Sequence, residues 1–561
     1  QLADAADAFK GPLIVKATEV TEQVVEAGTT IDSVTIPLRV AEDVNSEVGG
    51  LEISLASNLL SNLKMPAEQT LAEDYFPSLQ TLASRIAIAS QLRILSQKYA
   101  QPIADIDLAA TVATALEQLQ QLQQPDGGFA GWPSSESSDP FTTPYAVSAI
   151  AQAQSAGFSV NDSLLNQSKT YLSSLLADPG QYDYCQSGEC KNRVRLEILN
   201  ALADAGDERN QYLSWLYEQR ETFNLIEQIQ LARQLSLISD WQTEAAALAT
   251  QIQESLYETG RTTAINDANS YFRSWSWLNS QTATQSQALR LFTTREASPE
   301  LLSRLVQGLL SQQRDGTWQN SYNNAQALTA LTRYAQRLPN PPDFETTIQL
   351  GGKAVATKSF NGYEATSAEV KVPMRDLPSG DADLQLQKTG NGELHYVSAY
   401  RYRPDENPSG RLNGLRVTRQ IRTAGQSNAI HRFGLQPSDT AVPLPVGQVF
   451  DIGLDIISDH PVDHVIITDP LPAGLEAVDT SFQTATDAVQ AQQDSWEIDY
   501  QTIHSDRIQA YANHLDAGIY TLHYLVRSVT PGTFSWPGAT AHLQYAPEEF
   551  GRTTAATLKI E

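Results

Sequence analysis

The spacing of hydrophobic residues divides the chain into strand-like and helix-like parts. In the first part, apolar and polar residues alternate in short runs, which is typical of strands. These runs cover residues 12–17, 34–40 and 51–55, and Gly49 and Gly50 predict the turn before the last run. Three strands make an incomplete sheet with open edges. We therefore expect strands from later in the chain to complete it.

From about residue 59 to residue 338 the spacing becomes helical. Apolar residues recur at helical intervals in 82–95, 106–122 and 145–156, each of which predicts one helix. An α/α toroid of roughly a dozen helices fits a segment of this length, given ordinary helix and loop sizes.

Two breaks in the helical segment have related sequences. Residues 124–132 and 313–320 both contain an Asp-Gly turn, and a helix rich in small residues follows each, at Tyr145 and at Tyr322. Repetition of such a unit indicates that each unit buries its apolar face against its neighbours. We expect the aromatic residue after each break to fill the wall between adjacent helices.

Strand patterns return after the helical segment. They cover residues 347–350, 368–372, 384–386 and 394–402. The last segment, 412–561, contains alternating strands separated by Pro-Gly corners, as in 530–539, and this pattern predicts an antiparallel β-sandwich.

Composition excludes several classes of function. The 561 residues carry a formal charge of −27 and have no run of Lys or Arg, which argues against binding nucleic acid or an anionic membrane surface. No stretch reaches the roughly 18 apolar residues of a membrane-spanning helix. The length predicts about three or four domains. Because the chain begins at Gln1 rather than Met, we interpret this start as a processed or truncated end that further domains precede.

The two cysteines, Cys185 and Cys190, flank a glycine turn. A disulfide closing this short loop is natural in an oxidising compartment and is the favoured interpretation, with free thiols as the alternative. A zinc site would need two further ligands, yet the chain has no other cysteine and no histidine before His395. We therefore expect no metal site.

All eight histidines lie between His395 and His542, so the helical segment has no histidine base and no Ser-His pair. Its carboxylates could still act as acids and bases, but sequence alone selects no pair. Trp275 and Trp277 could line a cavity or belong to the core. We expect no catalytic residue and no cofactor, and we predict that the protein is not an enzyme.

Three groups of acidic residues could suggest catalysis. Terpene cyclases with related turns use Asp-x-Asp-Asp, whereas this chain has only isolated pairs without the second neighbour. Asp469 is interpreted as the cap of a proline-rich turn, and Asp506 as the end of a strand, rather than as members of a triad with His504. An enzyme of terpene cyclase or glycosidase type is therefore supported by the predicted fold alone. The isolated pairs are Asp105 with Asp107 and Asp381 with Asp383.

The stretch Pro66-Ala67-Glu68-Gln69 is, taken alone, an ordinary helix start. With the strand 51–55 before it and the residues 75–79 after it, the stretch resembles the thioester site Cys-x-Glu-Gln of the α2-macroglobulin and complement family, with proline at the cysteine position. The segments 465–476 and 530–539 resemble the C-terminal macroglobulin-like domain of the bacterial branch of that family.

This resemblance implies a multidomain α and β fold in which an α/α toroid is inserted into a CUB-like β-sandwich and an antiparallel β-sandwich follows. The predicted domains are the first half of the CUB-like sandwich, the thioester-type toroid, the second half of the CUB-like sandwich and the macroglobulin-like sandwich. They cover residues 1–58, 59–340, 341–411 and 412–561.

The resemblance also implies a protease inhibitor that works as a trap: a protease cuts a bait segment, which would lie upstream of Gln1, and is enclosed. A thioester then tethers the protease, but its formation needs a cysteine thiolate, and Pro66 has no sulfur. We therefore predict that Pro66, Glu68 and Gln69 form an inert site. The hypotheses are non-covalent trapping, a non-inhibitory module that binds other envelope proteins, or an engineered Pro66. The family implies target proteases as partners and a periplasmic or other extracytoplasmic location, often with a lipid anchor on the inner membrane.

Overall fold

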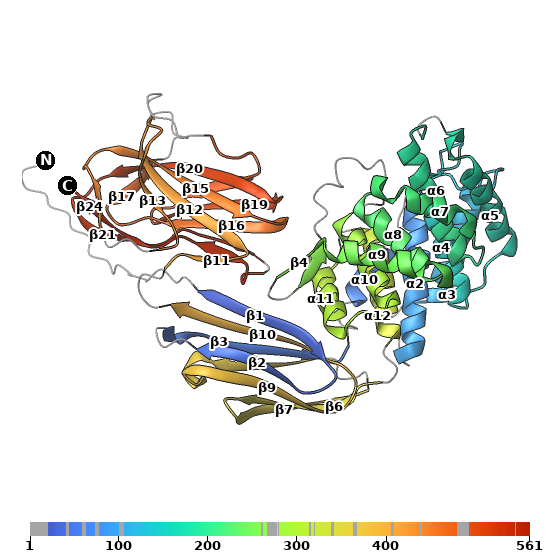
Figure 1. The fold of residues 1–561 in the computed structure, drawn as a ribbon, viewed down its shortest axis with the longest axis horizontal. Coiled ribbons are helices and arrows are strands. Elements are labelled where there is room, and N and C mark those ends of the chain that lie inside the picture. Colours follow the sequence, from blue (N-terminus) through green and yellow to red (C-terminus); the bar gives the residue numbers. More distant parts are fainter. Residues whose placement is uncertain are drawn as a thin grey trace, which may run out of the picture.

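The computed structural model describes most of the chain and shows a ring of helices, inserted in sequence within the first of two β-sandwiches, that lies beside both sandwiches in space (Figure 1). The residues that it describes are 21–40, 44–58, 63–72, 78–99, 106–182, 185–259, 262–265, 278, 280–313, 316–318, 320–337, 341–362, 367–404, 409–436, 440–478, 493–544 and 546–561. Some sequence expectations fall outside these residues, namely those on 12–17, 75–77, Asp105, Trp275, Trp277 and Asp315, the aspartate of the Asp-Gly turn in 313–320.

The first sandwich is built from strands at both ends of the helical segment. One antiparallel sheet has the order β1-β10-β3-β8 and the other the order β2-β9-β6-β7. Alternating apolar residues of the two sheets, among them Ile53, Phe344 and Leu384, share one buried core. Later strands therefore do complete the early sheet, as expected. The bounds are β1 Glu22–Thr30, β2 Val34–Val40, β3 Val44–Ala56, β6 Asp343–Leu350, β7 Lys353–Asn361, β8 Ser367–Pro373, β9 Gly380–Asn391 and β10 Leu394–Pro404.

The helical part contains twelve α-helices within the described residues. The helices α2, α4, α6, α8, α10 and α12 each contact the next, and α12 contacts α2, so these six close an inner ring. The helices α3, α5, α9 and α11 lie against this ring from outside. The bounds are α1 Lys64–Leu71, α2 Leu79–Tyr99, α3 Leu108–Leu122, α4 Thr143–Ser155, α5 Asp162–Ala177, α6 Gly188–Asp204, α7 Leu213–Glu218, α8 Leu225–Ser236, α9 Gln242–Gln253, α10 Gln281–Thr294, α11 Pro299–Leu310 and α12 Ser321–Gln336.

Local sequence explains where several helices begin. The side chain of Asp107 accepts two backbone N–H groups at the start of α3, and Asn224 and Glu227 form a reciprocal capping box at the start of α8. The aromatic residues after the two related breaks, Tyr145 on α4 and Tyr322 on α12, meet edge to face with ring centroids 5.2 Å apart. The two breaks therefore bring one end of α4 beside one end of α12.

A short hairpin interrupts the helical segment and was not predicted. The strands β4 (Leu256–Glu258) and β5 (Thr263–Ile265) pair antiparallel. Three residues per strand are too few to show a period of two, which is why the sequence pattern missed them. Tyr257 on β4 stacks on His460 of the C-terminal sandwich with ring centroids 4.6 Å apart. This hairpin therefore connects the ring of helices to the last part of the chain.

The C-terminal sandwich consists of one long, mainly antiparallel sheet and a three-stranded sheet with the order β14-β24-β21. Two buried clusters of apolar residues form its core, one around Leu454 and Val465 and one around Phe450 and Trp536. The bounds are β11 Arg411–Asn413, β12 Leu415–Thr423, β13 Ala429–Phe433, β14 Val442–Leu444, β15 Val449–Ser458, β16 Val462–Pro470, β17 Leu475–Val478, β18 Tyr500–Ile503, β19 Arg507–Leu515, β20 Gly518–Ser528, β21 Gly532–Trp536, β22 Thr540–Leu543, β23 Phe550–Arg552 and β24 Ala556–Ile560.

Asp469 does not cap a turn, so that interpretation was wrong. Its carboxylate is fully buried on β16, where it pairs with Arg419 Nη1 at 2.6 Å and accepts a hydrogen bond from the Tyr524 hydroxyl at 2.7 Å. The Arg419 guanidinium also lies 4.0 Å from the centre of the Trp536 ring. Burial raises the pKa of Asp469, although Arg419 opposes this effect. The carboxylate is thus a structural element of the sandwich core.

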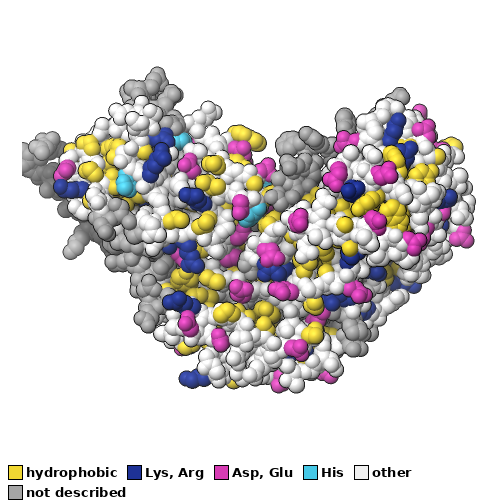
Figure 2. All heavy atoms as spheres, in the orientation of Figure 1, with side chains coloured by type: hydrophobic (Ala, Val, Ile, Leu, Met, Phe, Trp, Pro, Cys, Tyr) yellow, Lys and Arg dark blue, Asp and Glu magenta, His cyan; other side chains and the backbone are white. Residues whose placement is uncertain are grey.

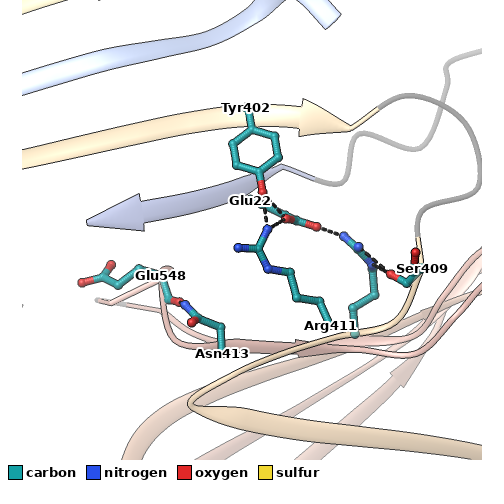
Figure 3. Close-up of polar contacts among 7 residues, drawn as sticks. Glu22, Tyr402, Ser409, Arg411, Asn413 and Glu548 are labelled. Atoms are coloured by element: carbon teal, nitrogen blue, oxygen red, sulfur yellow. Dashed lines mark hydrogen bonds and ion pairs between the residues drawn. The ribbon is translucent and has the colours of Figure 1, made fainter. Parts of the chain in front are cut away.

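A buried polar cluster joins the two sandwiches (Figure 3). Glu22 on β1 accepts hydrogen bonds from Tyr402 on β10 at 2.6 Å and from Arg411 on β11 at 2.5 Å. Its other oxygen pairs with Arg552 on β23, whose guanidinium also donates to Ser409 O at 2.7 Å. The carboxylate of Glu22 therefore holds two arginines of the C-terminal sandwich against the first sandwich.

The visible face of the molecule carries acidic and basic side chains interspersed, with no continuous basic patch (Figure 2). Among the described helices, none combines the length and the hydropathy that crossing a bilayer requires. The multidomain α and β fold is as expected from the sequence. The four domain boundaries stay predictions.

Candidate functional site

The thioester-like stretch forms α1, a helix of eight residues that packs against α2 and α12. Pro66 occupies its third position, where the missing N–H is one that the first turn of a helix leaves without an internal partner. The Pro66 ring and Thr70 face inward, while Glu68 and Gln69 are exposed at the surface. The local sequence therefore folds as a regular helix start around a buried proline.

Gln69 is held by a residue far away in the sequence. Its side-chain oxygen accepts a hydrogen bond at 2.8 Å from Nδ2 of Asn324, which also donates to Thr70 Oγ1 at 3.1 Å. Asn324 lies on α12, is 1% exposed, and accepts a hydrogen bond from the backbone N–H of Trp318 at 2.8 Å. One buried asparagine thus ties α1, α12 and the loop before α12 together.

The second of the two related breaks covers this helix. Gly316 has a positive φ of 77°, and a Cβ placed on it would meet Met65 Sδ at 2.6 Å, so Met65 lies directly over this glycine. Trp318 is 1% exposed and its indole N–H donates to Leu309 O at 2.7 Å. The break at 313–320, which the sequence indicated as a turn of a repeated helical unit, therefore also forms one wall of the thioester-like site.

The three predicted site residues lie on one helix, and within the described part of the chain only Gln69 has a side-chain partner outside that helix. Glu68 faces Lys64 at 3.8 Å, and both side chains are exposed, so this ion pair contributes little. Sequence reasoning did not identify Asn324. It is one of two adjacent asparagines that interrupt the small-residue pattern of α12, and this interruption was the available signal.

The chemistry of this arrangement lacks its nucleophile. A thioester forms when a cysteine thiolate attacks the side-chain carbonyl of a glutamine, and the Pro66 ring has no atom that could do so. What remains is an amide carbonyl that accepts a hydrogen bond from a buried donor. The site can position Gln69, but it cannot acylate a protein through a cysteine.

The structure joins Cys185 and Cys190 in a disulfide, with 5.4 Å between their Cα atoms. Ser187 caps α6 by accepting a hydrogen bond from the backbone N–H of Cys190, so the disulfide connects the residue two positions before this cap to the first turn of the helix. Among the described residues, no group of three or more His, Cys, Asp or Glu side chains is arranged to hold a metal ion.

Comparison with known proteins gives consistent results for the whole chain. The family model described as the bacterial α2-macroglobulin MG10 domain matches residues 414–548. An α2-macroglobulin homolog of Nostoc sp. is 50% identical over 562 residues, which cover 100% of this chain and 29% of the relative. The α2-macroglobulin of Escherichia coli K12 is 24% identical over 503 residues, covering 86% of this chain and 27% of the relative.

Solved structures show the same fold. The trypsin-activated α2-macroglobulin of Escherichia coli superimposes with a TM-score of 0.58 and 19% identity, over 96% of this chain and 36% of that chain. The Escherichia coli protein activated by porcine elastase gives a TM-score of 0.50 and 20% identity, over 97% of this chain and 46% of that chain.

The chain spans less than a third of the length of these curated relatives, 29% of one and 27% of the other. The alignment with the Nostoc relative covers this chain from end to end. The match to the MG10 domain lies in the C-terminal sandwich, whose sequence resembles the family most specifically. The combination of this identity, the domain match and the shared fold shows that the chain belongs to the bacterial α2-macroglobulin family.

Proposed function

We propose that this chain is the C-terminal part of an α2-macroglobulin-type protease inhibitor that retains proteases without a covalent thioester. The observation that carries this proposal is Pro66 at the position of the thioester cysteine. The sequence has only two cysteines, Cys185 and Cys190, and they are bonded to each other. No thiol is therefore available to form a thioester with Gln69 from another part of the chain.

Retention in this proposal depends on enclosure rather than on acylation. The partners are target proteases, which engage a bait segment in a part of the protein that precedes this chain, and other proteins of the cell envelope are further partners. The Cys185–Cys190 disulfide supports a location outside the cytoplasm, because disulfides persist in oxidising compartments. The proposed role includes no catalytic turnover.

The test uses the longest natural polypeptide that contains this sequence, mixed with a protease of broad specificity. Residual activity is assayed on a large protein substrate and on a small peptide, and the mixture is then run on a denaturing gel. Loss of activity on the large substrate alone, without a covalent adduct, is the expected result, because an enclosed protease remains accessible to a small peptide.

A Pro66→Ala variant serves as the matched control, since it removes the proline while still supplying no nucleophile. It should inhibit as the natural protein does. Full activity on both substrates would refute the inhibitor and leave the envelope-binding module as the alternative. A protease adduct that resists denaturation would refute the non-covalent mechanism.

A further inference from the structure

A polar cavity of about 70 Å³ lies on the axis of the helical ring. All six inner helices, α2, α4, α6, α8, α10 and α12, contribute residues to its wall. The interior of such a ring is usually apolar, but this wall includes three arginines and three acidic residues. These charges are unrelated to the thioester-like helix α1, which lies outside the inner ring.

One of the three arginines is neutralised. Arg193 on α6 pairs with Glu227 on α8, and both side chains are less than a tenth exposed. Glu227 also accepts the backbone N–H of Asn224 as part of the capping box of α8. Arg193 also lies 3.8 Å from Glu189, so each member of the pair has a further polar contact, which helps to make a buried ion pair tolerable.

The other two arginines have no such partner. Arg233 on α8 donates to Asn200 Oδ1 at 3.2 Å, and Arg290 on α10 donates to Gln287 Oε1 at 3.5 Å. Within the part of the chain that the structure describes, no carboxylate lies at ion-pair distance from either guanidinium. Burial, and next the neighbouring Arg233, lower the pKa of Arg290 to about 9, so it remains charged near neutral pH.

Among the described residues, several polar atoms in the same wall have no hydrogen-bond partner. They include Arg233 Nε and Asn200 Nδ2, both donors, and Gln230 Oε1, an acceptor, and these three residues are less than a tenth exposed. Buried polar atoms without a partner are rare in native proteins, and several around one cavity indicate a bound molecule or ordered water. A molecule in the cavity would therefore meet two guanidinium cations, one amide donor and one amide acceptor.

Glu197 cannot balance both cations. Its carboxylate contacts Gln230, and burial raises its pKa, while Arg193 and Arg233 oppose that effect. Asp204 also lines the cavity and favours the charged form of Arg290, but it is exposed at the end of α6, so even with Glu197 ionised the second cation is balanced only by a solvated carboxylate. A buried charge without a counterion is costly, and a bound anion would remove that cost.

We propose that this axial cavity binds a small oxyanion of the phosphate type, held by the guanidinium groups of Arg233 and Arg290 and by the amide of Asn200. Guanidinium groups match oxyanions through paired N–H donors. A hydrogen phosphate ion also carries a P–OH donor, which Gln230 Oε1 requires and which acetate lacks. The cavity has room for a few water molecules or one small ion, but not for a prenyl chain. This inference is independent of protease trapping.

The test is calorimetric titration of the folded protein with inorganic phosphate and, separately, with acetate, at constant ionic strength in chloride. We expect one phosphate site per chain and weaker binding of acetate. Arg290→Met should weaken phosphate binding at least about tenfold, because it removes one of the two cations. Arg416→Met is the matched control, since Arg416 is exposed on β12 and its loss changes the net charge equally.

Arg290→Lys and Arg233→Met are tested as well, in case Arg290→Met does not fold. Circular dichroism checks that each variant is folded. The lysine variant should bind phosphate with intermediate affinity, because it keeps the charge and loses the paired donors. Absence of phosphate binding at millimolar concentration would overturn the proposal. So would an equal loss in the Arg416→Met control, which would indicate non-specific attraction only.

Discussion

The side-chain oxygen of Gln69 accepts a hydrogen bond from Nδ2 of Asn324 across 255 residues of sequence, at 2.8 Å. Where a thioester member would use this glutamine carbonyl as its electrophile, the present chain uses it as a contact between α1 and α12. The same asparagine satisfies the backbone N–H of Trp318. This one side chain therefore connects α1, α12 and the loop before α12 at a position where Pro66 supplies no thiol.

Asn324→Ala should destabilise the helical part by about 1–3 kcal/mol, because it leaves the buried N–H of Trp318 without an acceptor. Gln69→Ala should change the free energy of unfolding by less than about 0.5 kcal/mol, because Gln69 is exposed and Nδ2 of Asn324 keeps its bond to Thr70. Urea unfolding of the two variants beside the natural protein measures both effects. Equal losses would show that the contact with Gln69, rather than the one with Trp318, carries the stability.

Pro66→Cys would place a thiol three residues before Gln69, about one turn away on α1. A thiolate near a helix N-terminus has a lowered pKa, and the Asn324 donor already polarises the Gln69 carbonyl. We expect the variant to release ammonia and to incorporate methylamine at Gln69, as seen by mass spectrometry. Pro66→Ser is the control and should do neither. A free, titratable thiol at position 66 of the variant, beside an intact glutamine, would mean that the geometry for thioester formation has also been lost.

Sequence periodicity predicted the long elements because apolar residues recur at a fixed interval in them. The strands in 34–40 and 51–55 lie inside observed strands with alternating burial, and the helix in 82–95 lies inside α2, which is buried on nearly every side. It missed β1, in which Glu22 is buried while Val24 is exposed, opposite to what hydropathy predicts. A charged residue at a buried strand position becomes intelligible only when its distant partners are known.

Those partners could not be inferred from local sequence. Arg552 lies 530 residues from Glu22, and Asn324 lies 255 residues from Gln69. Neither an arginine on a strand nor an asparagine on a helix has a periodic signature. The lack of a thiol at Pro66 is visible in the sequence because it depends on one residue type, whereas the contacts of Gln69 depend on how the chain folds.

Glu22→Gln should loosen the junction between the two sandwiches. It removes the only carboxylate that the structure places at ion-pair distance from the guanidiniums of Arg552, which is buried, and Arg411, which is partly exposed, within the described residues. Breaking a buried ion pair on one side costs about 3–5 kcal/mol. Urea unfolding and small-angle X-ray scattering would detect the loss of stability and the separation of the sandwiches.

Asp381→Asn is the control for Glu22→Gln. Asp381 pairs with Arg39 at 3.7 Å, but both side chains are almost fully exposed, so solvent already screens the pair. This variant should leave unfolding and scattering unchanged. An equally small effect of Glu22→Gln would show that the cluster does not hold the sandwiches together.

The contact between the helical ring and the C-terminal sandwich should depend on pH through His460. Its ring nitrogens lie 3.0 Å from Glu549 and 2.7 Å from Asp459, and the ring stacks on Tyr257, which Asp463 also faces. Burial alone would lower the pKa of His460, but the hydrogen bonds to the two carboxylates outweigh it and raise the pKa.

Because the folded-state pKa of His460 is raised, its contribution to stability is fully present below the unfolded value of about 6.5 and is lost as pH rises through the folded pKa. The difference in unfolding free energy between the natural protein and His460→Gln should therefore be largest in acid and should shrink above neutral pH. His542→Gln gives the opposite sign, since burial lowers the pKa of His542 and protonation opposes its folded state. Urea unfolding from about pH 5.5 to pH 8.5 measures both variants. A His460→Gln difference that is constant over this range would show that the neutral ring alone makes the contact with Tyr257.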